Sequence, residues 1–209
     1  MIQIFRFKIH YLIRKLTMIR YLCAFLFIQN VTSQNVHFNL NDENLYIVYK
    51  DSIKLKWSDF KAKPRKESAG IASNFSIEYH NVLQKKEYIV IVTTYMAKDE
   101  SYQFETPTRD SLYCLNHELT HFKISEVCAR YCRRDIKEIK SRRAKAIHKQ
   151  MLKIFYKYND MQNNLQDLYD EETRHSINRS KQREWNNLVD KWLNDLSEFS
   201  STKVILHLK

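Results

Sequence analysis

Glycine is almost absent from this chain of 209 residues, in which Gly70 is the single example and proline occurs twice. P-loops, dinucleotide-binding loops, kinase glycine loops and the GxSxG turn of serine hydrolases each need two or more glycines. In these loops the backbone must approach a phosphate or turn sharply. The sequence therefore excludes functional sites of these kinds.

Acidic residues are absent from residues 1–33, which carry five basic residues. A short apolar run from Tyr21 to Ile28 follows the basic residues, and small residues follow up to Ser33. This pattern is typical of an export signal, and the run is shorter than the roughly 20 residues of an ordinary transmembrane helix. We expect residues 1–33 to be an export signal, either cleaved after Ser33 or kept as an anchor, with Met18 as an alternative start.

The formal net charge of +11 comes from 35 basic and 24 acidic residues. Removal of residues 1–33 takes away five basic residues and leaves 30 against 24, or +6. The smaller charge weakens the argument for nucleic-acid binding. We expect an exported protein, periplasmic or extracellular, with no nucleic-acid partner and no stable membrane span after signal cleavage.

Cysteine is too sparse for a disulfide framework, because only Cys114, Cys128 and Cys132 lie beyond residue 33. On one helix, Cys114 and Cys128 would be roughly 21 Å apart, beyond the reach of a disulfide. Cys128 and Cys132 are one helical turn apart and would bridge only with strain. We expect mostly buried thiols.

Strand-forming residues dominate up to residue 105, and helical periodicity dominates from residue 106 onward. We expect strands near residues 45–49, 53–57, 71–79 and 88–95, and helices near residues 108–134, 138–168 and 176–198. This order predicts an α+β fold with a small, mostly antiparallel sheet followed by a helical half.

The segment from His117 to His121 reads H-E-L-T-H and matches the H-E-x-x-H pattern. Residues four apart on a helix lie on one face, so both imidazoles can bind one zinc ion, Zn²⁺. Glu118 would then act as the general base toward a zinc-bound water. We expect an apolar face made by Leu112, Leu115, Leu119 and Phe122. The alternative is an amphipathic helix with two incidental histidines.

A catalytic zinc site needs a third protein ligand. The metzincin extension is excluded, because Ile124 and Val127 occupy the places of its glycine and third histidine. The donor-rich segment 169–175 offers the ligand instead. We expect His175 as the third ligand, with Asp170 and then Glu171 as alternatives. A carboxylate not on the metal would orient a histidine, and a capping role at a helix junction is a further interpretation.

Four segments resemble motifs of a bacterial family, domain-of-unknown-function family 922, whose exported members are regarded as zinc-dependent proteases. These segments are Leu55–Pro64, Asn116–Glu126, Tyr169–His175 and Gln182–Trp185. The resemblance implies that His117, Glu118 and His121 form the site and that Asp170 and His175 belong to it. Two positions depart from the family pattern: Tyr102 stands in place of a tryptophan, and Ser176 in place of a frequent glycine.

These patterns predict that residues 34–209 form a single zincin-like metallohydrolase domain. Its function would be that of an exported zinc metallopeptidase acting on a peptide or protein substrate. The alternative is a non-catalytic binding module of the cell envelope, in which the basic stretch Lys137–Lys157 contacts an anionic surface.

Overall fold

The computed structural model describes residues 40–66, 68–82, 86–106 and 110–209. The chain divides into two units, residues 1–38 and 39–209, and the first unit lies outside the described residues together with the predicted export signal. In chain order the elements are β1 (Tyr46–Val48), the 3₁₀ helix η1 (Trp57–Asp59), β2 (Gly70–Val82), β3 (Glu87–Tyr102), α2 (Ser111–Lys137), α3 (Ala144–Thr173), α4 (Arg179–Asp195), the 3₁₀ helix η3 (Ser197–Phe199) and β4 (Lys203–His207).

The described strands form one antiparallel sheet in which β3 is the central strand. On one side β3 pairs with β2 from Glu87–Val82 to Ala97–Ala72, and the register shifts between Gly70 and Ala72. On its other side β3 pairs with β4 through residues 87–91 and with β1 through residues 95–97. Among the described strands, β2 therefore has only one neighbour and a free edge.

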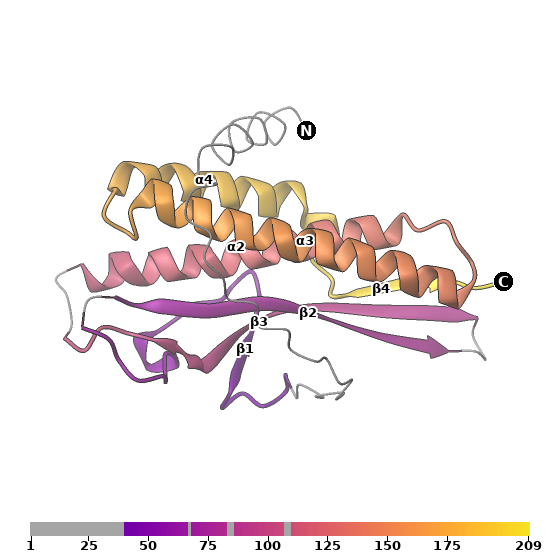
Figure 1. Ribbon diagram of the computed structural model, residues 1–209, viewed down its shortest axis with the longest axis horizontal. Coiled ribbons are helices and arrows are strands. Elements are labelled where there is room, and N and C mark those ends of the chain that lie inside the picture. The colour runs from indigo at the N-terminus through magenta and orange to yellow at the C-terminus, as the bar shows by residue number, and fades with distance from the viewer. Residues whose placement is uncertain (1–39, 67, 83–85, 107–109) are drawn as a thin grey trace, which may run out of the picture. The chain divides into compact units, whose positions relative to one another are not determined.

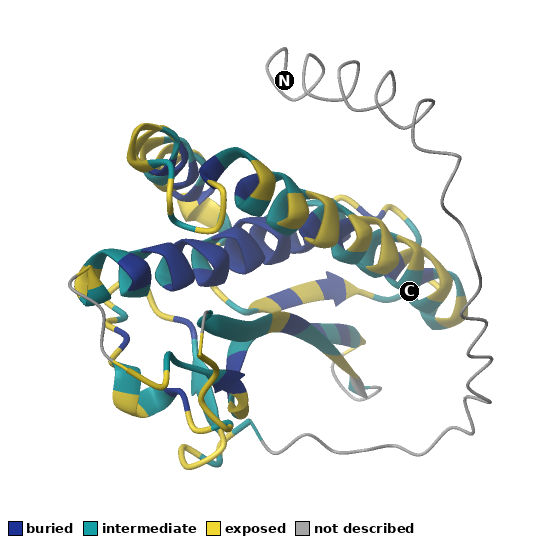
Figure 2. Ribbon diagram, turned by 60° about the vertical axis from the view of Figure 1, so that its left-hand side comes forward, coloured by how far each residue is buried: buried dark blue, intermediate teal, exposed yellow. Residues whose placement is uncertain are grey.

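The three helices cover one face of the sheet (Figure 1). Helix α2 lies next to the sheet, and α3 and α4 pack over it. Most of α2 is buried, as Figure 2 shows, whereas α3 and α4 each expose one side. A helix placed in this way can carry polar side chains into an enclosed site.

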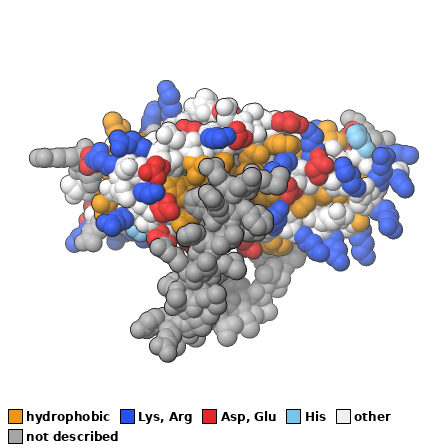
Figure 3. All heavy atoms as spheres, turned by 90° about the horizontal axis from the view of Figure 1, so that it is seen from above, with side chains coloured by type: hydrophobic (Ala, Val, Ile, Leu, Met, Phe, Trp, Pro, Cys, Tyr) orange, Lys and Arg blue, Asp and Glu red, His pale blue; other side chains and the backbone are white. Residues whose placement is uncertain are grey.

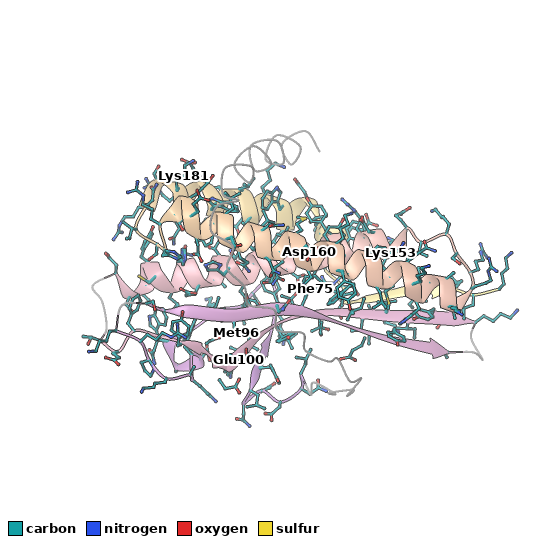
Figure 4. The ribbon with its side chains drawn as sticks, in the orientation of Figure 1. Phe75, Met96, Glu100, Lys153, Asp160 and Lys181 are labelled. Atoms are coloured by element: carbon teal, nitrogen blue, oxygen red, sulfur yellow. The ribbon has the colours of Figure 1, made fainter. Side chains whose placement is uncertain are left out.

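The core lies between the sheet and the helices. Alternate residues of β3 from Tyr88 to Met96 are buried, which is the pattern of a strand with one covered face. Phe75 on β2 points toward α3, where its ring meets that of Phe155 (Figure 4). This ring contact packs α3 against β2.

A buried ionic cluster ties the C-terminal segment to α2 and β3. Glu126 accepts hydrogen bonds from Arg130 and Arg133, and all three side chains are at most 3% exposed. Arg133 also donates to the carbonyl oxygens of Val92 and Phe199. The buried charges are therefore paired with one another and with backbone carbonyl oxygens.

The predicted α+β class and antiparallel sheet are confirmed, and each predicted helix is present with bounds shifted by a few residues. The strand expected at 53–57 is wrong: this segment is a loop leading into η1, and Leu55 fills the core from it. The helical half also ends in a strand, because β4 alternates buried Val204 and Leu206 with exposed neighbours.

Leu112 does not belong to the expected apolar face, because it lies in the first turn of α2 and is 81% exposed. The expected buried thiols are confirmed in the described residues, where Cys114, Cys128 and Cys132 are buried and free. Among the described helices, none combines the length and apolar character needed to cross a membrane.

Candidate metal centre

Three side chains from two helices converge on one point beneath α3. His117 and His121 lie one turn apart on α2, and Asp170 comes from the last turn of α3. The Nε2 atoms of the two histidines are 3.1 Å apart, and Asp170 Oδ1 is 3.1 Å from the first and 3.0 Å from the second. The three atoms form a nearly equilateral triangle.

The geometry and chemistry of this triangle fit a divalent metal ion such as zinc. A tetrahedral zinc ion with bonds of about 2.0–2.1 Å keeps its ligand atoms about 3.3 Å apart. Two imidazoles and one carboxylate are also a common donor set of catalytic zinc sites. Hydrogen bonding alone satisfies the triangle poorly, because two imidazole donors aimed at Asp170 Oδ1 lie 3.1 Å from each other.

His175 lies beside this triangle and not within it. Its Nδ1 is 3.4 Å from Asp170 Oδ1, and its side chain is 80% exposed. The group of atoms close enough to share an ion consists of His117, His121 and Asp170. Glu171 is exposed on the same turn. His175 as third ligand therefore stays a prediction, and Asp170, the second choice from the sequence, is the residue that the fold brings to both α2 histidines.

The backbone around His175 is unusual. Arg174, His175 and Ser176 have φ values of 50°, 49° and 69°, so three successive residues with side chains adopt the left-handed conformation. This conformation costs roughly 1–2 kcal/mol for each such residue. Ser176 stands where the motif that this segment resembles often has a glycine, and glycine adopts this left-handed conformation without strain.

Glu118 is buried on α2 beside the two histidines, with 5% of its surface exposed. Its Oε2 accepts a hydrogen bond of 3.0 Å from the backbone N–H of Ile71 at the start of β2. Burial raises the pKa of Glu118 to about 7, against opposing effects from His121 and Ile71. A carboxyl with this pKa can exchange a proton with a substrate or water near neutral pH.

The ionisation of the triangle favours a carboxylate next to at least one neutral imidazole. Burial alone would raise the pKa of Asp170, but hydrogen bonds from His117 and His121 hold it well below its usual range. Burial lowers the pKa of His117, although its contact with Asp170 opposes that effect. For His121, Asp170 and Glu118 outweigh burial and raise the pKa.

The triangle opens into a pocket of about 720 Å³ between β2 and the helices. The wall on the sheet side is residues 68–74, and Tyr102 and Phe104 extend it. Among the described residues that line the pocket there is no lysine or arginine, although the chain has 35 of them. Glu118 faces this pocket, so a bound molecule would lie within reach of both the triangle and the carboxyl.

Aromatic residues from the other motifs hold the site in place. The ring of Tyr169 stacks on His117 at 4.5 Å and meets His121 edge-on at 4.8 Å. Trp185 of α4 packs against Tyr169 and donates a hydrogen bond from Nε1 to Glu172. The motif segments on α2, α3 and α4 therefore form one contiguous structure.

Sequence reasoning missed two supports of the site, Gln166 and Ile71. Gln166 accepts a hydrogen bond from His121 Nδ1. Its spacing of four residues from Asp170 on α3 is the signal that would have placed it on the same helix face. Ile71 contributes only a backbone group, so its role leaves no mark on residue type.

No family model, no curated protein and no solved structure matches this chain. The resemblance to domain-of-unknown-function family 922 is therefore carried by its four motif segments and stays a prediction.

Proposed function

We propose that this protein is a zinc-dependent metallohydrolase with a zincin-like site that acts as a peptidase. The observation that carries the proposal is the triangle of His117 Nε2, His121 Nε2 and Asp170 Oδ1, with sides of 3.0–3.1 Å, next to the buried carboxyl of Glu118. Zinc-assisted hydrolysis requires ligands such as two histidines and one carboxylate, together with a nearby carboxyl that does not bind the metal, and this set matches both requirements.

Zinc held by these residues would polarise a scissile carbonyl group and lower the pKa of a water molecule. Glu118 would accept a proton from that water and later deliver it to the leaving amine. The Ile71 N–H holds one oxygen of Glu118, so the other oxygen is left for proton transfer. The pocket beside β2 would hold the substrate, and its wall and the buried α2 would restrict entry of bulk water.

Metal content and activity of matched variants test this proposal. Purified wild-type protein should contain about one equivalent of zinc, as a single site requires. His117→Ala should lose the zinc, whereas His148→Ala, a histidine of α3 that contacts Tyr88, should keep it. Equal and negligible zinc in wild type and His117→Ala would refute the metal site.

The variant Glu118→Gln tests the role of Glu118 as general base separately from metal binding. This variant should retain zinc and lose cleavage of a labelled, unfolded protein substrate by at least about 100-fold, the lower range for loss of a general base. Cleavage at the wild-type rate by Glu118→Gln would remove the assignment of Glu118 as the base.

A second function, binding to an anionic surface of the cell envelope, is favoured by one observation. Basic side chains gather at the end of the molecule where α3 begins, seen on the right in Figure 3. Lys145, Lys149 and Lys153 are exposed and spaced by four residues, so they share one face of α3, where Lys153 points outward in Figure 4. Salt-sensitive binding to anionic vesicles that survives loss of both His117 and His121 would support this function.

A further inference from the structure

Each imidazole of the triangle has a second nitrogen, Nδ1, and a glutamine side chain is placed near each of the two histidines. Gln166 on α3 contacts His121 Nδ1 through its Oε1. The Nε2 of the same amide donates to the carbonyl oxygen of His121 at 3.1 Å and to Ser125 Oγ at 3.2 Å. Because the amide nitrogen can only donate, these two bonds turn Oε1 toward the histidine. His121 Nδ1 must then carry a hydrogen, so that in the neutral ring Nε2 is the nitrogen with the lone pair for a metal ion.

On the side of His117, Gln182 of α4 is held at the turn of α2 that leads into this histidine. Gln182 is fully buried, and its Nε2 donates to the Tyr113 carbonyl and to Asn116 Oδ1, each at 3.3 Å. Its Oε1 is thus left as a buried acceptor without a hydrogen bond among the described residues, and His117 Nδ1 is likewise buried without one.

One buried ring nitrogen that can donate, His117 Nδ1, and one buried acceptor, Gln182 Oε1, are therefore both left unpaired within the described part of the chain. Gln182 is held at Tyr113 and Asn116, four residues and one residue before His117 on α2. Unpaired buried polar groups are destabilising, and a hydrogen bond from His117 Nδ1 to Gln182 Oε1 would pair both. The arrangement on α4 then repeats the one on α3.

We propose that Gln166 and Gln182 are positioning residues that each accept the Nδ1 hydrogen of one metal-binding histidine and so direct both Nε2 atoms to the ion. The proposal rests on the metal site of the proposed function. Glutamine is neutral, so it fixes the tautomer without adding negative charge, unlike the carboxylates that often support zinc-bound histidines. The ion would keep more of its positive charge for polarising a substrate carbonyl.

Zinc affinity, measured by competition with a coloured chelator, tests the two glutamines without reference to activity. Gln166→Leu and Gln182→Leu should each weaken zinc binding by about 10- to 100-fold, the usual cost of losing such a partner. Two variants serve as matched controls. Gln162→Leu removes a glutamine one turn before Gln166 on α3, whose Nε2 donates to the carbonyl oxygen of Ser73. Asn186→Ala removes an amide of α4 that, like Gln182, donates to Asn116 Oδ1. Both controls should bind zinc as the wild type does.

The outcomes separate the two proposals. Wild-type affinity in both leucine variants, with zinc bound normally by the wild type, overturns the role of the glutamines and leaves the metal site intact. Absence of zinc binding by the wild type overturns the metal site itself.

Should Gln182→Leu not fold, nitrogen NMR of labelled histidines in zinc-loaded wild type gives the answer. Hydrogen on Nδ1 and metal on Nε2 of both histidines is the expected result, and metal on Nδ1 of His117 would contradict the proposal.

Discussion

Glu118 and Ile71 join the buried helix to the free edge of the sheet: Glu118 Oε2 accepts a hydrogen bond of 3.0 Å from the Ile71 N–H. The carboxyl lies on α2, and the N–H lies at the beginning of β2. A single contact thus fixes the distance between the proposed base and the strand that lines the pocket. The same burial that places Glu118 there also makes its charged form costly.

The metal-free protein should therefore lose stability as pH rises from about 4.5 to about 7. The pKa of Glu118 is raised from 4.5 to about 7, so the folded chain holds a proton over a range where the unfolded chain has lost it. The free energy of unfolding then falls through that range. Glu118→Gln should remove this fall and be more stable than wild type by up to about 3 kcal/mol at pH 8, with little difference at pH 4.

Urea denaturation in the presence of a chelator, at pH 4, 6 and 8, measures this effect. Glu138→Gln is the control, because Glu138 is an exposed glutamate next to Lys140. Parallel stability curves for wild type and Glu118→Gln would contradict the prediction.

Asp170→Ala should weaken zinc binding far more than His175→Ala. Asp170 Oδ1 lies within 3.1 Å of both α2 histidines, whereas His175 is 80% exposed and its Nδ1 is 3.4 Å from that same oxygen. Chelator competition compares the two variants directly. The opposite order would favour His175 as the third ligand.

Ser176→Gly should stabilise the protein by about 1 kcal/mol. Ser176 has φ 69°, where a side chain is strained and glycine is not. Thermal or urea unfolding measures the gain. Ser180→Gly is the matched control: Ser180 lies in the first turn of α4, and glycine there should cost about 0.5–1 kcal/mol.

Gly70→Ala should destabilise the protein by about 1–3 kcal/mol through overpacking. A Cβ at this position would lie 2.7 Å from the ring and hydroxyl of Tyr102, which also carries the guanidinium of Arg65 at 3.8 Å. Tyr102 must therefore leave its place on the pocket wall. In a double-mutant cycle with Tyr102→Ala, the cost of the added methyl should largely disappear; a cost that stays unchanged would place the strain in the backbone.

Arg133→Met should destabilise the protein by about 3–5 kcal/mol, because it leaves Glu126 with one fewer partner in a buried site. Lys137→Ala is the comparison: its pair with Glu198 is exposed and should contribute at most about 1 kcal/mol. Equal losses in the two variants would mean that Arg133 contributes no more than a surface charge.

Periodicity was sufficient to predict the three helices and the two long strands, because each spans several repeats of its own pattern. It failed at residues 53–57, where alternating apolar side chains fill the core from a loop. It also missed residues 203–207, although buried Val204 and Leu206 alternate with exposed neighbours there. Short apolar segments can serve either structure, and the packing around them decides.

The local part of the site was readable because His117, Glu118 and His121 are close in sequence. The positions of Asp170 and His175 relative to the α2 histidines could not be read from the sequence. They depend on the left-handed turn that ends α3 and leaves His175 exposed. Gln166 meets His121 across 45 residues and Gln182 meets Asn116 across 66, and such contacts exist only once α3 and α4 have packed on α2.

The pairing of β4 with β3 joins residues 203–207 to residues 87–91, more than a hundred positions earlier in the chain. Until those last residues have been synthesised, the first half of β3 lacks a neighbour on that side, and Val90 and Val92 lack part of their cover. Contacts of such long range lower the folding rate. If residues 1–33 act as the export signal that their pattern predicts, the sheet would still lack β4 while residues 203–207 are being made, so the sheet under the helix that carries His117 and His121 would be completed late.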